Sequence, residues 1–510
     1  MNVLRRLAAS LSIWRKMPFF RPHSHAAASS PAPSAKKPLS DKQKNTRVPL
    51  LSLTPSAAER VRDKLRAVLQ TTQALRLEMR ERADRLERAQ ALDPNRYAVE
   101  AAAELAEGVL PAGEVQGASQ GEAVWEGGTV HEGGAVSSIE KTLDLSSSSR
   151  DRSLFPIRAS LGPLPAGSPA EADASILRWV VEETRRMNRS NVTRTYAYYR
   201  LYLRHPELHW AFLAHLVSRN AGWNMTDLKG SLVSRLINAR LTEAMFQMLE
   251  RANALIFQDA YPQLLLYQEG KRRGRPLHAL LRQLPVSSFM PPLWEDFAVT
   301  GDPVPLAIGL IINEQQYIQG RVVENPFFEK EVLDDGFFHL GALLHTNQVL
   351  FPFLEEGGDR LHLAGLTLED FPDVDERIRF GRKLYALLFG VPAVQAGCRR
   401  FAERTPHTGS RADYWPQRFT NVKEASPPLS KGEMPPVESP KLYSPTLADA
   451  WSTRPIEPAV PGDWFRDMSP LKHFSALKPP ASWIMDREHQ LLIQAQEAAV
   501  LAKTWANPRA

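Results

Sequence analysis

The sequence predicts a mainly α-helical protein: a large helical domain with a disordered N-terminal tail, a separate N-terminal helix and an extended C-terminal arm rich in Pro and Trp. Apolar residues recur every three or four positions from about residue 171, which is the period of an amphipathic helix. No strand-like alternation exceeds four residues. The 40 prolines are too many to lie inside helices, so much of the chain must be loop.

Residues 1–53 lack periodicity and are predicted to form a disordered basic tail. The first 50 residues carry a charge of +9, whereas the whole chain carries +6, so the remainder sums to −3. This balance speaks against nucleic-acid binding by the core and leaves it open for the tail. The start of the tail also resembles an organellar import segment, and Met17 is an alternative start.

Residues 54–107 are predicted to form a helical segment. Thr54 and Pro55 are typical of a helix start, and Pro94 stops the pattern. The apolar seam from Val61 to Ala89 fits either a dimeric coiled coil or a charged helix packed on its own chain. Residues 108–170, rich in Gly and Ser, are predicted to be a flexible linker.

Residues 171–420 are predicted to form the helical core domain. The periodic segments cover 176–187, 191–203, 205–217, 225–237, 241–257, 305–323, 337–350 and 375–389. Two of them, 305–323 and 337–350, are nearly all apolar, which indicates a central position. The single cysteine, Cys398, excludes an intrachain disulfide and is predicted to be a small core or near-surface residue rather than a nucleophile.

Residues 421–485 are predicted to form a Pro-rich arm packed on the core. Trp451, Trp464 and Trp483 are spaced along this segment, and such aromatic side chains favour an arm that lies on the domain. Residues 486–510 close the chain as a helix. The most apolar run, Val304 to Ile312, is far too short to span a bilayer.

Four strings carry a resemblance: 191–195, 218–230, 312–318 and 407–414. On these residues the chain resembles the YppC-like family of bacterial proteins of unknown function, over about residues 175–505. The resemblance implies a bacterial, cytoplasmic protein rather than an organellar one. It implies no reaction, ligand or catalytic residue.

Glu314 is the first candidate for chemistry, since it lies on an apolar helical stripe with Leu310 and Ile318. A carboxyl group there must be paired, protonated or hydrated, and burial raises its pKa toward neutrality. His345 and Asn347 occupy a similar position in the second apolar segment. If the two helices touch, these residues and Asn313 would line a polar pocket. The alternatives are an ion pair between Glu314 and an arginine, and a hydrogen-bonded core histidine.

The segment 407–414 is the densest polar string. Ser410 and Arg411 could hold an anion, and Asp413 could orient His407 or Arg411. The alternative is that these residues cap helices and stabilise turns.

A second polar string is predicted to form a loop between helices. In it, Asn220, Asn224 and Asp227 are candidates for ligand binding or, alternatively, for helix capping. Arg219 could pair with Asp227, with Glu314 or with a ligand.

No metal site and no cofactor are predicted. His205 and His209 have a ligand-like spacing, but Pro206 disrupts the helix between them and no glutamate completes a metal motif. The basic string 271–275 and the Arg/Tyr-rich helix over 191–203 suit either single-stranded nucleic acid or a solvated basic face.

The sequence supports three hypotheses about function. The first is a cytoplasmic helical binding or scaffold protein, with a polar pocket in its core and a protein partner. The second is a hydrolase or transferase in which Glu314 acts on an anionic substrate held by Arg219 or Arg411. The third is nucleic-acid association through the tail. Convergence of Glu314, His345 and the 407–413 loop around a cavity would favour the second, and the sequence leaves the oligomeric state undetermined.

Overall fold

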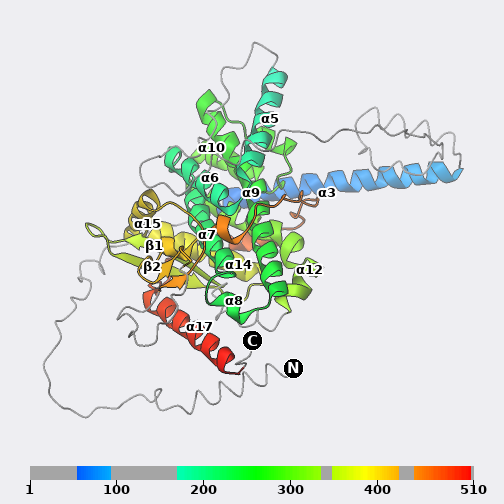
Figure 1. Ribbon diagram of the computed structural model, residues 1–510. Helices are drawn as coiled ribbons and strands as arrows, with labels where there is room; N and C mark the ends of the chain where they lie inside the picture. The colour runs from blue at the N-terminus through cyan, green and yellow to red at the C-terminus, as the bar shows by residue number, and fades with distance from the viewer. Residues whose placement is uncertain (1–53, 93–168, 335–346, 424–440, 507–510) are drawn as a thin grey trace, which may run out of the picture. The chain divides into compact units, whose positions relative to one another are not determined.

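The computed structural model describes residues 54–92, 169–334, 347–423 and 441–506 (Figure 1). The predicted tail and nearly all of the predicted linker lie outside these ranges. The chain divides into two units, residues 67–159 and all the rest. Of the first unit only residues 67–92 are described, and they are helical. The other unit, which holds all the remaining described residues, is mainly α-helical, as predicted.

The elements follow one another along the chain with their observed bounds. The first half contains α3 (Pro55–Leu92), α5 (Pro169–Met187), α6 (Asn191–Arg204), α7 (His209–Asp227), α8 (Val233–Leu236), α9 (Ala239–Arg273), η3 (His278–Gln283), α10 (Pro291–Thr300), α11 (Pro303–Ile318), η4 (Gln319–Val323), α12 (Pro326–Phe328) and η5 (Glu329–Leu333). The second half contains β1 (Gln348–Leu354), β2 (Leu361–Thr367), α14 (Val374–Gly390), α15 (Pro392–Arg404), η7 (Arg411–Asp413), β3 (Phe419–Thr420), β4 (Leu442–Tyr443), α16 (Leu447–Ala450), η8 (Ser469–His473) and α17 (Asp486–Ala506).

Local signals explain several of these bounds. Ser190 caps α6 through a capping box with Thr193. Asn238 caps α9 by accepting a hydrogen bond from the Leu241 backbone. Gly274 ends α9 in the left-handed conformation, at φ 65°. The start of α3 at Pro55 agrees with the predicted start of this helix, whereas its predicted stop at Pro94 lies outside the described residues.

Helices α7, α9 and α11 pack against one another in the core, and α14 packs on α7 and α11. Most residues of α7 and α11 are buried, which confirms the prediction that the segment 305–323 is central. Cys398 is fully buried in α15, as predicted, and burial raises the pKa of its thiol.

The helix predicted over 337–350 is wrong in its described part. Residues 335–346 lie outside the described ranges, while Gln348–Leu354 forms β1, paired antiparallel with β2. A short apolar run does not distinguish a strand from a buried helix by periodicity. Pro352 disfavours a helix, and the run is rich in aromatic and branched residues. With α7 and α15 packed on it, β1 is buried along most of its length, so no alternation marked it in the sequence.

Two helix boundaries were also predicted wrongly. The helix expected to open at His205 begins at His209. Residues 220–227, expected to be a loop, are the last two turns of α7. These turns contain polar residues with low helix propensity, but their side chains are bonded to other elements, and tertiary contacts override propensity.

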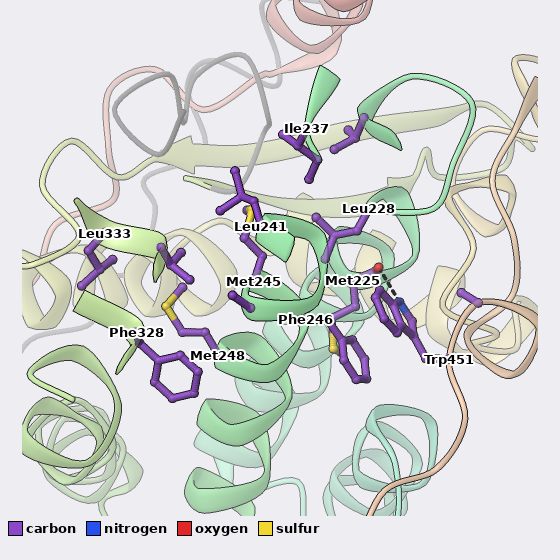
Figure 2. Packing of buried hydrophobic residues seen from close by; sticks show 14 of the residues in the cluster. Met225, Leu228, Ile237, Leu241, Met245, Phe246, Met248, Phe328, Leu333 and Trp451 are labelled. Carbon is purple, nitrogen blue, oxygen red and sulfur yellow. Dashed lines mark hydrogen bonds between the residues drawn. The ribbon is translucent and has the colours of Figure 1, made fainter. Parts of the chain in front are cut away.

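The Pro/Trp-rich arm lies on the helical core. Trp451 stacks on Phe246 at a centroid distance of 3.9 Å and donates from Nε1 to the Met225 carbonyl oxygen at 2.8 Å (Figure 2). Farther along, Asp463 accepts hydrogen bonds from Ser287 and Ser288. The arm in the predicted fold class is therefore confirmed, although its exact limits remain a prediction.

None of the helices in the described ranges has the length and apolar character needed to cross a bilayer.

Candidate functional site

The described candidate residues fall into two buried groups, apart from Asn220, Asn224 and Asn347. The Arg411 cluster lies where α6 and α7 meet the segment 405–414 and β4. Its members are Asn191, Arg219, Asp227, His407, Ser410, Arg411, Asp413 and Ser444. The Asp259 cluster lies between α9, α11 and the arm, and its members are Asp259, Gln263, Asn313, Glu314 and Trp464.

Arg411 and Asp227 form a buried ion pair at the centre of the Arg411 cluster. The guanidinium lies between the rings of Trp223 and Phe419, 4.5 and 4.9 Å from their centroids. Burial raises the pKa of Asp227 to about 6, and the charge of Arg411 offsets only part of that rise. Arg411 is therefore occupied by its own chain and holds no free guanidinium for a substrate anion.

Ser410 and Ser444 attach the arm to the Arg411 cluster. Ser410 Oγ donates to the Ser444 carbonyl oxygen at 2.6 Å, and Ser444 Oγ accepts from the Arg411 backbone at 2.8 Å. Ser410 also caps η7 by accepting from the Ala412 backbone. The capping alternative thus describes Ser410 better than anion binding does.

His407 is buried against α6 and α7. Its Nε2 is 2.8 Å from Asn191 Oδ1, and its Nδ1 is 3.8 Å from a carboxyl oxygen of Asp413. Burial holds the pKa of His407 well below its usual value, so the ring is neutral. The close approach requires a glycine at 222, because a Cβ there would lie 2.5 Å from Asn191 Oδ1 and 2.7 Å from the His407 ring.

Asp413 is used by its own turn. It accepts hydrogen bonds from the Thr408 backbone and hydroxyl, both at 2.8 Å, and burial raises the pKa of its carboxyl group. Asp413 forms no ion pair with Arg411, and its 3.8 Å distance from His407 Nδ1 exceeds hydrogen-bond length.

Arg219 pairs with neither Asp227 nor Glu314. It donates to the Thr405 and Pro406 carbonyl oxygens at 2.8 and 3.4 Å, and its guanidinium lies 4.8 Å from the Phe401 ring centroid. It thus satisfies the carbonyl groups after the last turn of α15.

Three asparagines have structural surroundings. Asn220 donates to the Gln348 carbonyl oxygen at 2.9 Å and accepts from the Leu350 backbone at 3.0 Å, so its amide pairs with β1 as a neighbouring strand would. Asn347 bonds the Leu368 carbonyl oxygen at the end of the hairpin. The buried Asn224 lies inside α7, so it does not cap that helix. His345 lies outside the described residues.

Asn313 links the arm to α9 in the Asp259 cluster. Its amide oxygen accepts from Trp464 Nε1 at 2.8 Å, and its amide nitrogen donates to Asp259. Asp259 also accepts from Gln263 Nε2 at 3.1 Å, and burial raises the pKa of this carboxyl group to about 7. Its other oxygen is buried without a hydrogen-bond partner among the described residues.

Glu314 lies at the edge of the same cluster and is only partly buried by exposed area. It accepts from Trp210 Nε1 at 3.1 Å and from the side chain of Gln315 at 3.2 Å. Burial raises the pKa of Glu314 to about 8, and the neighbouring Asp259 adds to that rise. No arginine pairs with it in the described residues, so it is protonated rather than ion-paired at neutral pH.

Sequence reasoning missed Asp259, Gln263, Ser444 and the part that Asn191 plays. The signal for Asp259 was present, since this carboxyl residue follows Leu255 by four positions on an apolar helical face. Ser444, by contrast, lies in a Pro-rich segment without a regular apolar period, so the sequence does not indicate which of its residues face the core.

The two clusters do not converge on a cavity. No hydrogen bond or ion pair links Glu314 to the described segment 407–413. A gap between α7, α9 and α11, beside Trp210, is too small to hold a water molecule. Within the described ranges, no group of three His, Cys, Asp or Glu side chains is placed to bind a metal ion. The arrangement can therefore hold helices and arm together, but it presents no open site for a substrate.

The other polar features also have partners. His209 Nδ1 is 2.9 Å from the Tyr385 hydroxyl, and its ring stacks on Phe389 at 4.0 Å. Each cation of the basic string 271–275 has an acidic partner: Lys271 pairs with Glu207, Arg272 and Arg273 share Glu269, and Arg275 pairs with Asp173.

Fold and site together define a class: a mainly α-helical domain cross-linked by buried polar networks, with a C-terminal arm bound to its surface. The chain belongs to a family described as a protein of unknown function (DUF2515), whose model matches residues 186–497. Over 259 residues it is 43% identical to the uncharacterized protein YppC of Bacillus subtilis (strain 168), an alignment that covers 51% of this chain and 78% of that protein. No solved structure matches the chain. The resemblance noted in the sequence is thereby confirmed.

Proposed function

We propose that this chain is a bacterial, cytoplasmic binding or scaffold protein that acts through contacts with another protein. The observation that supports it most directly is that several candidate side chains for ligand binding and catalysis are engaged with their own chain. Arg411 pairs with Asp227, Arg219 binds backbone carbonyl groups and Asp413 holds a turn. Buried polar groups that bind their own chain in this way help to specify and rigidify a fold.

The enzyme hypothesis is supported less. It requires Glu314 as acid or base together with Arg219 or Arg411 on one substrate. Glu314 has a pKa raised to about 8, which suits an acid, but neither arginine contacts it.

The nucleic-acid hypothesis now concerns only the tail. The ion pairs of residues 271–275 reduce the attraction of that loop for a polyanion, since three carboxylates offset its four cations. Arg194, in the Arg/Tyr-rich helix, is buried and pairs with Glu250 at 2.5 Å. Retention of the full chain on a polyanion column, compared with a chain whose tail arginines and lysines are neutralised, tests this hypothesis.

Affinity capture of the full chain from a native bacterial lysate tests the proposal, with mass spectrometry of proteins and small molecules. A protein that is recovered in fixed stoichiometry with both the natural chain and a Glu314→Gln variant supports a binding function. A small molecule that is retained by the natural chain and lost from Glu314→Gln, without any protein partner, would overturn the proposal in favour of the enzyme.

A further inference from the structure

A shallow groove of about 300 Å³ lies between α5 and the end of η3. Its apolar lining is Leu177 and Val181, one helical turn apart on α5, together with Leu284. Val181 is 43% exposed, although it is a branched apolar residue. Helix α5 also packs on α9, and its buried residues include Ile176 and Val180. Leu177 and Val181 lie beside them along the helix, and among the described residues Val181 stays exposed. Residues at this spacing are typical anchors for a partner helix.

Two of the four polar residues that line the groove are arginines. Arg178, Arg185 and Glu182 line it together with Gln283. Neither Arg178 nor Arg185 forms an ion pair with any of the described residues, and Arg178 hydrogen-bonds only to the Ser175 hydroxyl. In residues 271–275, by contrast, every cation has an acidic partner. Uncompensated arginines beside an apolar stripe complement a partner with the opposite charge.

We propose that this groove binds a helical segment of another protein that carries apolar anchors flanked by Asp or Glu. The inference rests on the proposed binding function and assigns it a surface and a partner chemistry. Leu177, Val181 and Leu284 receive the apolar side chains, while Arg178 and Arg185 contact the acidic ones. A volume near 300 Å³ lies at the lower end of the range for binding pockets, which fits one or two anchor side chains.

Site-specific photocrosslinking in the full chain tests the inference. A benzophenone amino acid is placed at Val181, and at Val299 as the matched control, because Val299 is an 85% exposed valine in α10, outside the groove. After irradiation in native lysate, the crosslinked peptides are identified by mass spectrometry. The expected result is a crosslink from Val181 to an acidic segment with apolar residues, and no such crosslink from Val299.

Binding measurements supply the second readout. A fluorescent amphipathic Leu/Glu peptide of about four helical turns should bind the full chain, and the matching Leu/Lys peptide should not. Arg178→Glu combined with Arg185→Glu should weaken binding about tenfold or more, and added salt should weaken binding to the natural chain. Val181→Asp should remove binding without unfolding the chain, because the residue is exposed. Arg360→Glu, at an exposed turn between β1 and β2, combined with Arg466→Glu, also exposed and outside the groove, is the charge-matched control.

The outcomes separate this inference from the proposed function. Crosslinks from Val181 to a basic segment, to a second copy of this chain or to nothing above the Val299 level would overturn the inference. So would equal binding of the Leu/Glu and Leu/Lys peptides. If a protein partner is still captured in fixed stoichiometry in any of these cases, the binding function stands and uses another surface. If no protein is captured at all, both proposals fail.

Discussion

Replacement of Trp451 by alanine would show what holds the C-terminal arm on the helical core. The indole is 7% exposed, stacks on Phe246 and donates to the Met225 carbonyl oxygen at 2.8 Å. Loss of a buried tryptophan costs about 3–5 kcal/mol. Trp451→Phe keeps most of the ring and removes the donor, so it should cost about 1–3 kcal/mol for the unsatisfied carbonyl group. The aromatic packing is thus predicted to outweigh the hydrogen bond.

Hydrogen–deuterium exchange measures this cost locally, because the backbone amides of residues 450 and 451 donate to the Thr446 and Leu447 carbonyl oxygens in the folded protein. A penalty of about 3 kcal/mol raises the population of a detached arm at least about a hundredfold, since each 1.4 kcal/mol is a factor of ten. Exchange of these two amides should accelerate accordingly in Trp451→Ala, much less in Trp451→Phe, and not in the exposed control Val460→Ala. Equal rates for the alanine and phenylalanine variants would refute the primacy of ring packing. An unchanged rate in Trp451→Ala would show that other contacts hold the arm.

Two further substitutions test the polar framework by urea denaturation. Gly222→Ala should destabilise the fold by about 1–3 kcal/mol, because its Cβ would overlap Asn191 and His407. The gain in helix propensity, roughly 1 kcal/mol, is too small to offset the cost of this overlap. Gly320→Ala, where a Cβ meets only a distant carboxyl oxygen, is the control and should not destabilise; equal effects would contradict the packing argument. Asn220→Ala should cost about 2 kcal/mol or more, since it leaves two buried backbone groups of β1 without partners, and a loss under about 0.5 kcal/mol would argue that water replaces the amide.

The helices were predictable where a start signal, an apolar period and a stop signal agree. Thr54 and Pro55 fixed the start of α3, and the apolar character of 305–323 indicated its central position in the core. The β1–β2 hairpin was not predictable from its own residues. Its first strand is covered by α7 and α15, and burial from several sides removes the alternation that marks a strand.

The sequence indicated which residues of the candidate site are unusual, but it did not indicate which of them contact one another. A polar residue on an apolar stripe signals a buried contact, and Glu314 and Asn313 were found in that way. Which residue such a side chain contacts depends on the tertiary structure, which the local sequence does not specify. Arg411 finds Asp227 more than 180 positions away in the sequence, and Asn220 binds the backbone of a strand whose own residues predict a helix.

Glu314 gives the last prediction, which concerns pH. Burial raises its folded-state pKa to about 8, above the usual 4.5, so the folded chain binds this proton more tightly than the unfolded chain. Stability from this group is therefore fully present below about pH 4.5 and is lost as pH rises toward 8, by at most about 1.4 kcal/mol per pH unit. Asp259, with a pKa raised to about 7, acts in the same direction.

Glu314→Gln removes this ionisation while keeping an acceptor for Trp210 Nε1. The variant should therefore match the natural chain at about pH 5 and exceed it in urea midpoint at about pH 8.5, with a flatter profile between them. Asp259→Asn in the same series separates the two carboxyl groups. Identical pH profiles for the natural chain and Glu314→Gln would mean that Glu314 is ionised and hydrated in the folded protein. In that case water reaches the edge of the Asp259 cluster, and the main argument against a catalytic role for this carboxyl group is lost.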